Sequence, residues 1–289
     1  MNPRQKVWIS SLPGRRLSLS AWGGPGFTLV EFLVVAARIA LGALMLVPAL
    51  AQTRPGVKTI QCRNNLKQFT AAWRMYGSDN DDRLVASSGG VTGRPAWVSG
   101  IIDYSPGNAS NWDINQDIVR SPLWAYIGRD WALFRCPADQ SQVVVGGVRK
   151  PRVRSISMSH VFGKGEWLDR YFTPSQSVWR TYATGADIMI PARTFLFIDE
   201  HPDSINDGSF AVACTGANQS STAQIIDFPA SYHDNGACGM SFADGRSDTH
   251  KWLGVTIKPP IGGGFYLNVS AGDSWADISW LAQNTTVRR

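Results

Sequence analysis

The stretch that decides the fold is GFTLVEFLVVAARIALGALMLVPALA, residues 26–51. After the first six positions it is apolar apart from Arg38. As a helix, residues 27–51 would extend over roughly 37 Å, which exceeds the ~30 Å thickness of the hydrocarbon core of a membrane. The sequence therefore predicts a long N-terminal hydrophobic helix that spans or assembles in a membrane, preceded by a leader, residues 1–26.

The leader is basic and contains no acid; its charged residues are Arg4, Lys6, Arg15 and Arg16. These four supply most of the formal net charge of +6, so the remainder of the chain has no basic run that could follow a phosphate backbone. Nucleic acid is therefore excluded as a partner. Basic residues before an apolar segment keep the N-terminus in the cytoplasm. We expect a single pass in the cytoplasmic membrane, with the body exported to the periplasm or cell surface.

An ordinary secretory signal peptide is the alternative interpretation of this N-terminus. Two features of the sequence argue against it. The small residue that would precede a cleavage site, Gly26, lies before the apolar run and not after it. A lone acid, Glu31, lies five residues after Gly26, and an unpaired carboxylate in a bilayer is costly and usually functional.

Residues 26–31 resemble the cleavage and methylation site of type IV prepilins and type II secretion pseudopilins. The resemblance implies that a prepilin peptidase cuts after Gly26 and methylates Phe27. It also implies that Glu31 meets the N-terminal amine of a neighbouring pilin-like subunit during assembly. The alternative role for Glu31 is that of an acid favoured at a helix start. Arg38 departs from the unbroken apolar stretch of that family.

A second helical segment is predicted at residues 57–79, after an interruption at Thr53-Arg54-Pro55-Gly56. Its apolar residues recur every three or four positions, as on one face of an amphipathic helix. They are Cys62, Leu66, Phe69, Trp73 and Tyr76. In the resembling family this segment is the second part of a helical spine. We expect its apolar face to be covered by a sheet.

The remainder, residues 80–289, is predicted to be an exported α+β body with a mainly antiparallel sheet and long loops. Residues 193–200 read as a buried strand, and Asp244-Gly245 between residues 240–243 and 247–252 is typical of a β-hairpin turn. His233, Asp244 and Gly245 resemble the His-x9-Asp-Gly element of a prepilin-type processing-associated family, although ten residues and not nine separate His233 from Asp244.

No enzyme motif is found in the sequence. The four histidines show no tight metal-binding spacing, and neither a nucleophile elbow nor a phosphate-binding loop is present. Oxygen donors gather in one loop after the predicted strand, which is the ligand chemistry of Ca²⁺, although an ordinary solvated turn has the same composition. They are Asp199, Glu200, Asp203, Asn206 and Asp207. Apart from this weak calcium option, no cofactor is expected.

The four cysteines, Cys62, Cys136, Cys214 and Cys238, lie far apart in the sequence. In an exported body they could form two disulfides. Cys62 lies on the apolar helix face and Cys136 at the end of a short buried segment, so Cys62–Cys136 and Cys214–Cys238 are the expected pairs. Four buried free thiols acting as small hydrophobic groups are the alternative.

The resemblance implies a membrane-anchored subunit or accessory of a type IV pilus or type II secretion pseudopilus. The alternative function is an anchored surface protein that binds carbohydrate or another extracytoplasmic ligand, suggested by the 12 tryptophans. Those that could stack on sugar rings if exposed are Trp97, Trp112, Trp167, Trp179 and Trp275. Core packing is the competing explanation for them.

Overall fold

The computed structural model describes residues 28–170, 178–262 and 266–289, except for the side chains of residues 40–55. The leader and the predicted cleavage position, Gly26-Phe27, lie outside the described residues. The chain divides into two units, Met1–Ala51 and Gln52–Arg289. Each unit is described by itself.

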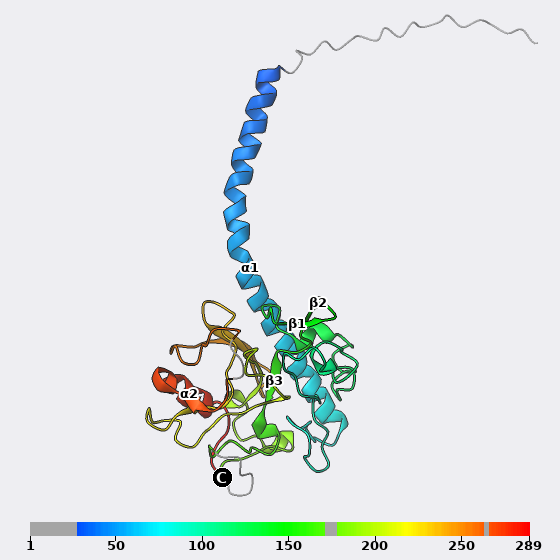
Figure 1. Ribbon diagram of the computed structural model, residues 1–289, viewed down its shortest axis with the longest axis vertical. Coiled ribbons are helices and arrows are strands. Elements are labelled where there is room, and N and C mark those ends of the chain that lie inside the picture. Colours follow the sequence, from blue (N-terminus) through cyan, green and yellow to red (C-terminus); the bar gives the residue numbers. More distant parts are fainter. Residues whose placement is uncertain (1–27, 171–177, 263–265) are drawn as a thin grey trace, which may run out of the picture. The chain divides into compact units, whose positions relative to one another are not determined.

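The longest element is helix α1, Leu29–Asp79, which has residues in both units (Figure 1). Within the described part of the chain, no helix combines the length and apolar character needed to cross a membrane. The expectation of a long N-terminal hydrophobic helix is therefore wrong. The helix is long, but it continues into a segment with charged side chains such as Lys58, Arg63 and Lys67 and is not apolar as a whole.

The interruption expected at residues 53–56 is also absent from this helix, since α1 continues through Pro55 and Gly56. A proline removes only one backbone donor, and the hydrogen bonds of the turns on either side can carry the helix past it. The helix ends where the polar stretch predicts. Asp82 N donates to Gly77 O across 2.8 Å, and Asp81 and Asp82 both have positive φ values, of 54° and 62°.

The body is an α+β unit built on a five-stranded sheet of order β5-β3-β4-β7-β8. The strands are β3 (Ile156–Ser159), β4 (Phe195–Asp199), β5 (Ser209–Phe210), β7 (Ala237–Phe242) and β8 (Ser247–Lys251). All neighbours pair antiparallel except β3 with β5. The predicted hairpin is confirmed as β7–β8, in register Ser241↔Ser247, and the predicted buried strand is confirmed as β4.

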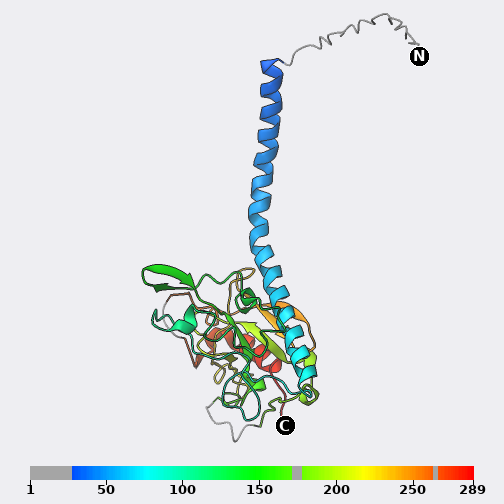
Figure 2. The ribbon, with the colours of Figure 1, turned by 90° about the vertical axis from the view of Figure 1, so that its right-hand side faces the viewer.

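Smaller elements surround this sheet. One two-stranded sheet pairs β1 (Gln142–Val145) with β2 (Val148–Pro151), and this hairpin projects from the body in Figure 2. Another pairs β6 (Gln224–Ile225) with β9 (Val269–Ser270). The second α-helix is α2 (Trp275–Gln283). Short 3-10 helices are η1 (Ala109–Asn111), η2 (Trp131–Phe134), η3 (His160–Phe162), η5 (Gly185–Asp187), η6 (Pro191–Arg193) and η7 (Gly272–Ser274).

The core lies between the second part of α1 and the sheet. Four of the five residues on the predicted apolar face, Cys62, Leu66, Phe69 and Trp73, are buried, and Tyr76 is partly buried against the same cluster. The Phe69 ring lies 4.9 Å from that of Phe134 and 5.2 Å from that of Phe197 on β4. The amphipathic pattern therefore identified the face that the sheet covers.

Candidate metal centre

Four side chains with metal-binding chemistry meet in the core of the body: Cys62, Cys136, Asp199 and His233. One ligand atom from each lies within 4.8 Å of all the others. The four residues are between 0 and 2% exposed. They come from α1, from the turn after η2, from the last position of β4 and from the loop before β7. The fold thus joins four distant segments at one point.

Helix and turn geometry place the two thiols. Cys62 lies on the buried face of α1, one turn before Leu66. Cys136 follows η2, and its backbone N–H donates to Ser155 Oγ across 2.8 Å. The N–H of Ala138 donates to Cys136 Sγ across 3.3 Å. Such a backbone donor stabilises negative charge on sulfur.

Strand register places the carboxylate. Asp199 ends β4, where it pairs with Ile156 of β3. Its Oδ2 accepts hydrogen bonds from Cys62 Sγ at 2.8 Å and from the N–H of Gly239 at 3.4 Å. Its Oδ1 is buried and has no hydrogen-bond partner among the described residues.

A tight turn before β7 places the imidazole. The backbone of His233 pairs with that of Ala237, with hydrogen bonds of 2.6 and 3.0 Å, around a turn in which Asp234 and Asn235 have positive φ. The ring Nε2 lies 3.2 Å from Cys136 Sγ and 3.5 Å from Asp199 Oδ2. The ring Nδ1 lies 3.2 Å from Thr59 Oγ1.

These contacts control the protonation of the cluster. Hydrogen bonding with Cys136, burial and the negative charge of Asp199 raise the pKa of the Cys62 thiol well above its ordinary value. Burial by itself lowers the pKa of His233, but the hydrogen bonds with Asp199 and Cys136 outweigh it and raise that pKa to about 10. At neutral pH these shifts favour a protonated Cys62 sulfur and a charged His233 ring.

A Cys–His–Asp arrangement could indicate a nucleophile with its base, but the geometry here does not fit one. In such a triad the carboxylate orients the ring through the nitrogen that faces away from the nucleophile. Here Asp199 and Cys136 both face Nε2, and Nδ1 faces Thr59. Burial also denies a substrate access to the sulfur. The four donor atoms lie close enough to hold a small cation, and the two thiols could instead form a disulfide.

The loop residues predicted as a calcium site have different hydrogen-bond partners. Asp199 belongs to the cluster with Cys62, and Glu200 Oε1 accepts from Ser204 Oγ at 2.9 Å. Asp203 accepts from Tyr104 Oη and from the N–H of Gly262, at 2.8 and 2.7 Å. Asp207 accepts from the N–H of Ser209, and Asn206 Oδ1 accepts from the N–H of Asp207. Among the described residues, the group of potential ligands that meets within 4.8 Å is the Cys62 cluster.

All four cysteines are free thiols in the structure. Cys62 and Cys136, the first expected disulfide pair, are brought together, whereas the second pair has separate neighbours. Cys214 Sγ lies 3.9 Å from Ala282 O, and Cys238 lies on β7 opposite His250. Both disulfides stay predictions.

The residues of the His-x9-Asp-Gly resemblance do not share a site. His233 precedes β7, and Asp244 and Gly245 form the turn that follows this strand of six residues. A strand of that length separates its ends by about 20 Å. Gly245 has a φ of 95°, which suits the hairpin turn. His250, which the sequence places beyond the same turn, stacks on Trp280 with ring centroids 3.5 Å apart.

The tryptophans that could bind a sugar are mostly covered. Trp97 is fully buried and stacks on Phe134, in agreement with core packing and not with sugar binding. Lys150 Nζ lies 3.9 Å over the ring of Trp112. Trp167 is half-buried, and Trp275 is 39% exposed.

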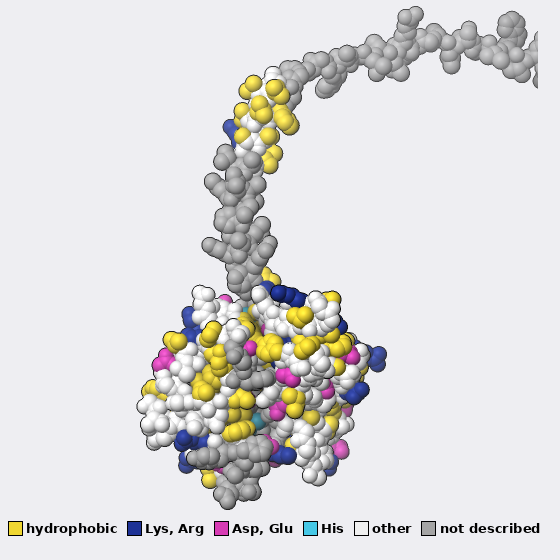
Figure 3. Space-filling view, in the orientation of Figure 1, with side chains coloured by type: hydrophobic (Ala, Val, Ile, Leu, Met, Phe, Trp, Pro, Cys, Tyr) yellow, Lys and Arg dark blue, Asp and Glu magenta, His cyan; other side chains and the backbone are white. Residues whose placement is uncertain are grey.

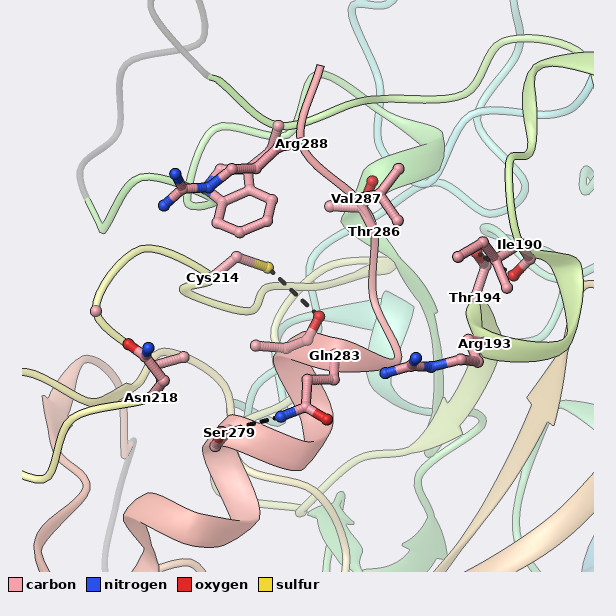
Figure 4. Close-up of a pocket in the computed structure, with 14 residues that line it drawn as sticks. Ile190, Arg193, Thr194, Cys214, Asn218, Ser279, Gln283, Thr286, Val287 and Arg288 are labelled. Atoms are coloured by element: carbon pink, nitrogen blue, oxygen red, sulfur yellow. Dashed lines mark hydrogen bonds between the residues drawn. The ribbon is translucent and has the colours of Figure 1, made fainter.

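The remaining tryptophan, Trp179, lines a cavity of about 480 Å³ beside α2. Figure 4 shows Cys214, Arg193 and Arg288 around this cavity. The guanidinium of Arg288 lies 5.2 Å over the Trp179 ring, and Trp179 Nε1 donates to Thr215 Oγ1 across 2.9 Å. One face of the indole is therefore taken by a cation.

Sequence reasoning identified Cys62, Cys136, Asp199 and His233 individually but assigned them to three different roles, and it missed Thr59. Helical spacing could have found Thr59, because it lies three residues before Cys62 and so on the same face of α1. Comparison of the chain with models of protein families, with curated proteins and with solved structures finds no match.

Proposed function

We propose that the chain is a prepilin-like protein that a prepilin peptidase processes after Gly26. In this proposal it is a subunit or accessory of a type IV pilus or type II secretion pseudopilus. It is located at the cytoplasmic membrane with its body exported, and its partners are the peptidase and other pilin-like subunits. The proposal rests on residues 26–31 and on the surface that follows them.

The observation that carries the proposal is the exposed apolar surface at the start of α1 (Figure 3). Leu29 is 75% exposed and Phe32 is 61% exposed. The other exposed apolar residues of this stretch are Val30, Leu33, Val34, Val35 and Ile39. A stretch of helix that exposes this many apolar side chains needs a covering environment. Assembly with other subunits supplies one.

Glu31 lies in this apolar stretch and caps the helix. Thr28 precedes the first residue of α1, and its N–H and hydroxyl both donate to Glu31 Oε2 across 2.9 Å. The N–H of Glu31 lies 3.3 Å from Thr28 Oγ1. This reciprocal pair is a capping box. Glu31 therefore has a local role at the helix start, and its proposed role in assembly is additional to it.

The mature N-terminus tests the proposal. The full-length chain is expressed in cells with and without an active prepilin peptidase, and its N-terminal peptide is identified by mass spectrometry. We expect an N-terminus at methylated Phe27 only where the peptidase is active. Gly26→Ala is expected to be tolerated, and Gly26→Leu is expected to block cleavage. An intact leader in the presence of active peptidase would contradict the proposal, and so would cleavage after residue 51.

A further inference from the structure

We propose that Cys62, Cys136, Asp199 and His233 bind one Zn²⁺ ion, which fastens α1 to the sheet of the body. The ligand atoms are the two Sγ atoms, one Oδ of Asp199 and Nε2 of His233. Neither the prepilin resemblance nor the calcium loop leads to this assignment. It does not depend on the proposed function, because every ligand lies in residues 52–289.

The donor set favours zinc. Thiolate and imidazole together are typical ligands of Zn²⁺, and Asp oxygen is a regular fourth ligand, whereas Ca²⁺ and Mg²⁺ prefer oxygen alone. Four protein ligands in a buried position are typical of a structural site, because a catalytic site keeps one position open for water or substrate. The four side chains here are buried and supply four ligands.

Two distances between ligand atoms are close to those around a tetrahedral ion. Bonds of about 2.3 Å to sulfur and about 2.0 Å to nitrogen or oxygen place neighbouring ligand atoms about 3.3–3.8 Å apart. The Nε2 atom of His233 lies 3.2 Å from Cys136 Sγ and 3.5 Å from Asp199 Oδ2. The 2.8 Å contact between Cys62 Sγ and Asp199 Oδ2 is a hydrogen bond that the ion would replace. The unpartnered Oδ1 of Asp199 gives the carboxylate a second oxygen to offer.

Groups around the ligands support the same arrangement. Thr59 Oγ1 lies at Nδ1 of His233, so a neutral ring can hold its proton there and leave the Nε2 lone pair for the ion. The N–H of Ala138 donates to Cys136 Sγ, and the N–H of Gly239 donates to Asp199 Oδ2. Such outer contacts orient ligands and are a regular feature of zinc sites.

The proton balance of binding is defined. The sulfurs bind as thiolates, so their S–H protons pass to solvent, and the His233 ring binds through an Nε2 that carries no proton. Two thiolates, one carboxylate and one divalent ion leave a net charge of −1, which the two backbone donors face.

The rival state is the Cys62–Cys136 disulfide, in which the two sulfurs would be joined and could not both be thiolate ligands. The test therefore uses full-length chain purified under reduction and exposed to the metal alone. Metal content is measured by elemental mass spectrometry. Co²⁺ is titrated as a spectroscopic probe, because tetrahedral coordination and cobalt–thiolate bonds give separate absorption bands, and Zn²⁺ is then added in competition.

We expect one Zn²⁺ per chain and a Co²⁺ spectrum of a tetrahedral site with two thiolates, which Zn²⁺ abolishes. Cys136→Ser is expected to weaken Zn²⁺ binding by more than tenfold. In the Co²⁺ spectrum, it should lower the intensity of the cobalt–thiolate band, because one of the two thiolates is lost. Thr59→Val, which removes the hydroxyl that faces Nδ1 of His233, should weaken Zn²⁺ binding about 10–100-fold. The control Cys214→Ser removes another buried thiol, which lies outside the cluster, and this variant should bind one ion as the wild type does.

Two results would overturn the proposal. One is a reduced wild-type chain that binds no Zn²⁺ or shows no cobalt–thiolate band, a measurement that requires no variant to fold. The other is binding that Cys214→Ser lowers as much as Cys136→Ser does. His233→Cys keeps a ligand at that position and should retain more binding than His233→Ala. The two proposals can fail separately. Cleavage after Gly26 in a chain that binds no Zn²⁺ would contradict only the zinc site, and Zn²⁺ binding by a chain whose leader stays intact would contradict only the proposed function.

Discussion

Cys62 Sγ on α1 donates a hydrogen bond to Asp199 Oδ2 at the end of β4 across 2.8 Å, although 137 positions separate the two residues. Both side chains are fully buried. The bond lies where the helix crosses the middle of the sheet, since β4 is the third of five strands in the order. Moving the helix away would leave both buried groups without this hydrogen bond, which is destabilising. The same contact therefore fixes the position of α1 on the sheet and forms one edge of the proposed zinc site.

Gly239 allows that contact, and Gly239→Ala should disrupt it. A Cβ at this position would lie 2.5 Å from Cys62 Sγ, 2.9 Å from Leu66 Cδ1 and 3.0 Å from Asp199 Oδ2. We expect the free energy of unfolding to fall by about 1–3 kcal/mol, as in other overpacked cores. Denaturant unfolding measures it. Gly89→Ala, where a Cβ meets nothing within 4 Å, is the control. Equal stability of the two variants would show that α1 does not lie this close to β7.

The pH dependence of stability should reveal the buried carboxyl of Asp227. Burial and the negative charge of Asp207 raise the pKa of Asp227 to about 8, against the lowering effect of its hydrogen bond from the N–H of Ala211. Because the folded pKa is above the unfolded value of 3.8, its stabilising contribution is complete below pH 3.8 and is lost as pH rises to about 8. Asp227→Asn should therefore become more stable than wild type over this interval.

The measurement for Asp227 is the difference in the free energy of unfolding between Asp227→Asn and wild type at pH 5 to about pH 8. The asparagine keeps an oxygen for the N–H of Ala211, so the hydrogen bond is retained. Asp81→Asn is the control, because Asp81 is exposed and its positive φ suits asparagine equally. A difference that does not grow with pH would contradict the assignment.

The second part of α1 and the β7–β8 hairpin could be predicted because their signals are local. Helical spacing identified the buried face from Cys62 to Trp73, and the Asp244-Gly245 pair located the turn. The cluster could not be predicted in this way. Its members lie on four segments far apart in the sequence, and only the folded chain brings their ligand atoms within 4.8 Å of one another. Asp199 illustrates the limit, since the sequence grouped it with its neighbours in an acidic loop.

At the N-terminal helix, local sequence signals predicted features that the structure does not have. Apolar composition over residues 32–51 and the breaker at Pro55 suggested two helices, the first of them hydrophobic throughout. The structure has one helix from Leu29 to Asp79 in place of them. Helix boundaries depend on whether neighbouring turns can carry the hydrogen-bond pattern past one missing donor, which residue type alone does not decide.

Phe69 should be the most sensitive aromatic position on α1. Its ring contacts those of Phe134, Phe197 and Trp97 at centroid distances of 4.9, 5.2 and 5.8 Å. Phe69→Ala would remove these contacts and leave a cavity, so the free energy of unfolding should fall by about 3–5 kcal/mol. Met75→Ala on the same helix is the control, because Met75 is 46% exposed and should cost less than about 1 kcal/mol. Thermal or denaturant unfolding measures the stability of both variants. A similar loss of stability in the two would contradict the position of Phe69 in the core.

Two substitutions at the start of α1 should separate capping from assembly. Glu31→Gln removes the charge but can still complete the capping box with Thr28, whereas Thr28→Ala removes the cap and keeps the charge. If the carboxylate meets the amine of a neighbouring subunit, Glu31→Gln should lose incorporation into filaments while cleavage after Gly26 continues. Thr28→Ala should still be incorporated, because losing a cap weakens the helix start by only about 1 kcal/mol. The measurement is the amount of each variant in sheared filaments, relative to processed protein in the same cells. Normal incorporation of Glu31→Gln together with loss for Thr28→Ala would assign Glu31 to the helix start alone.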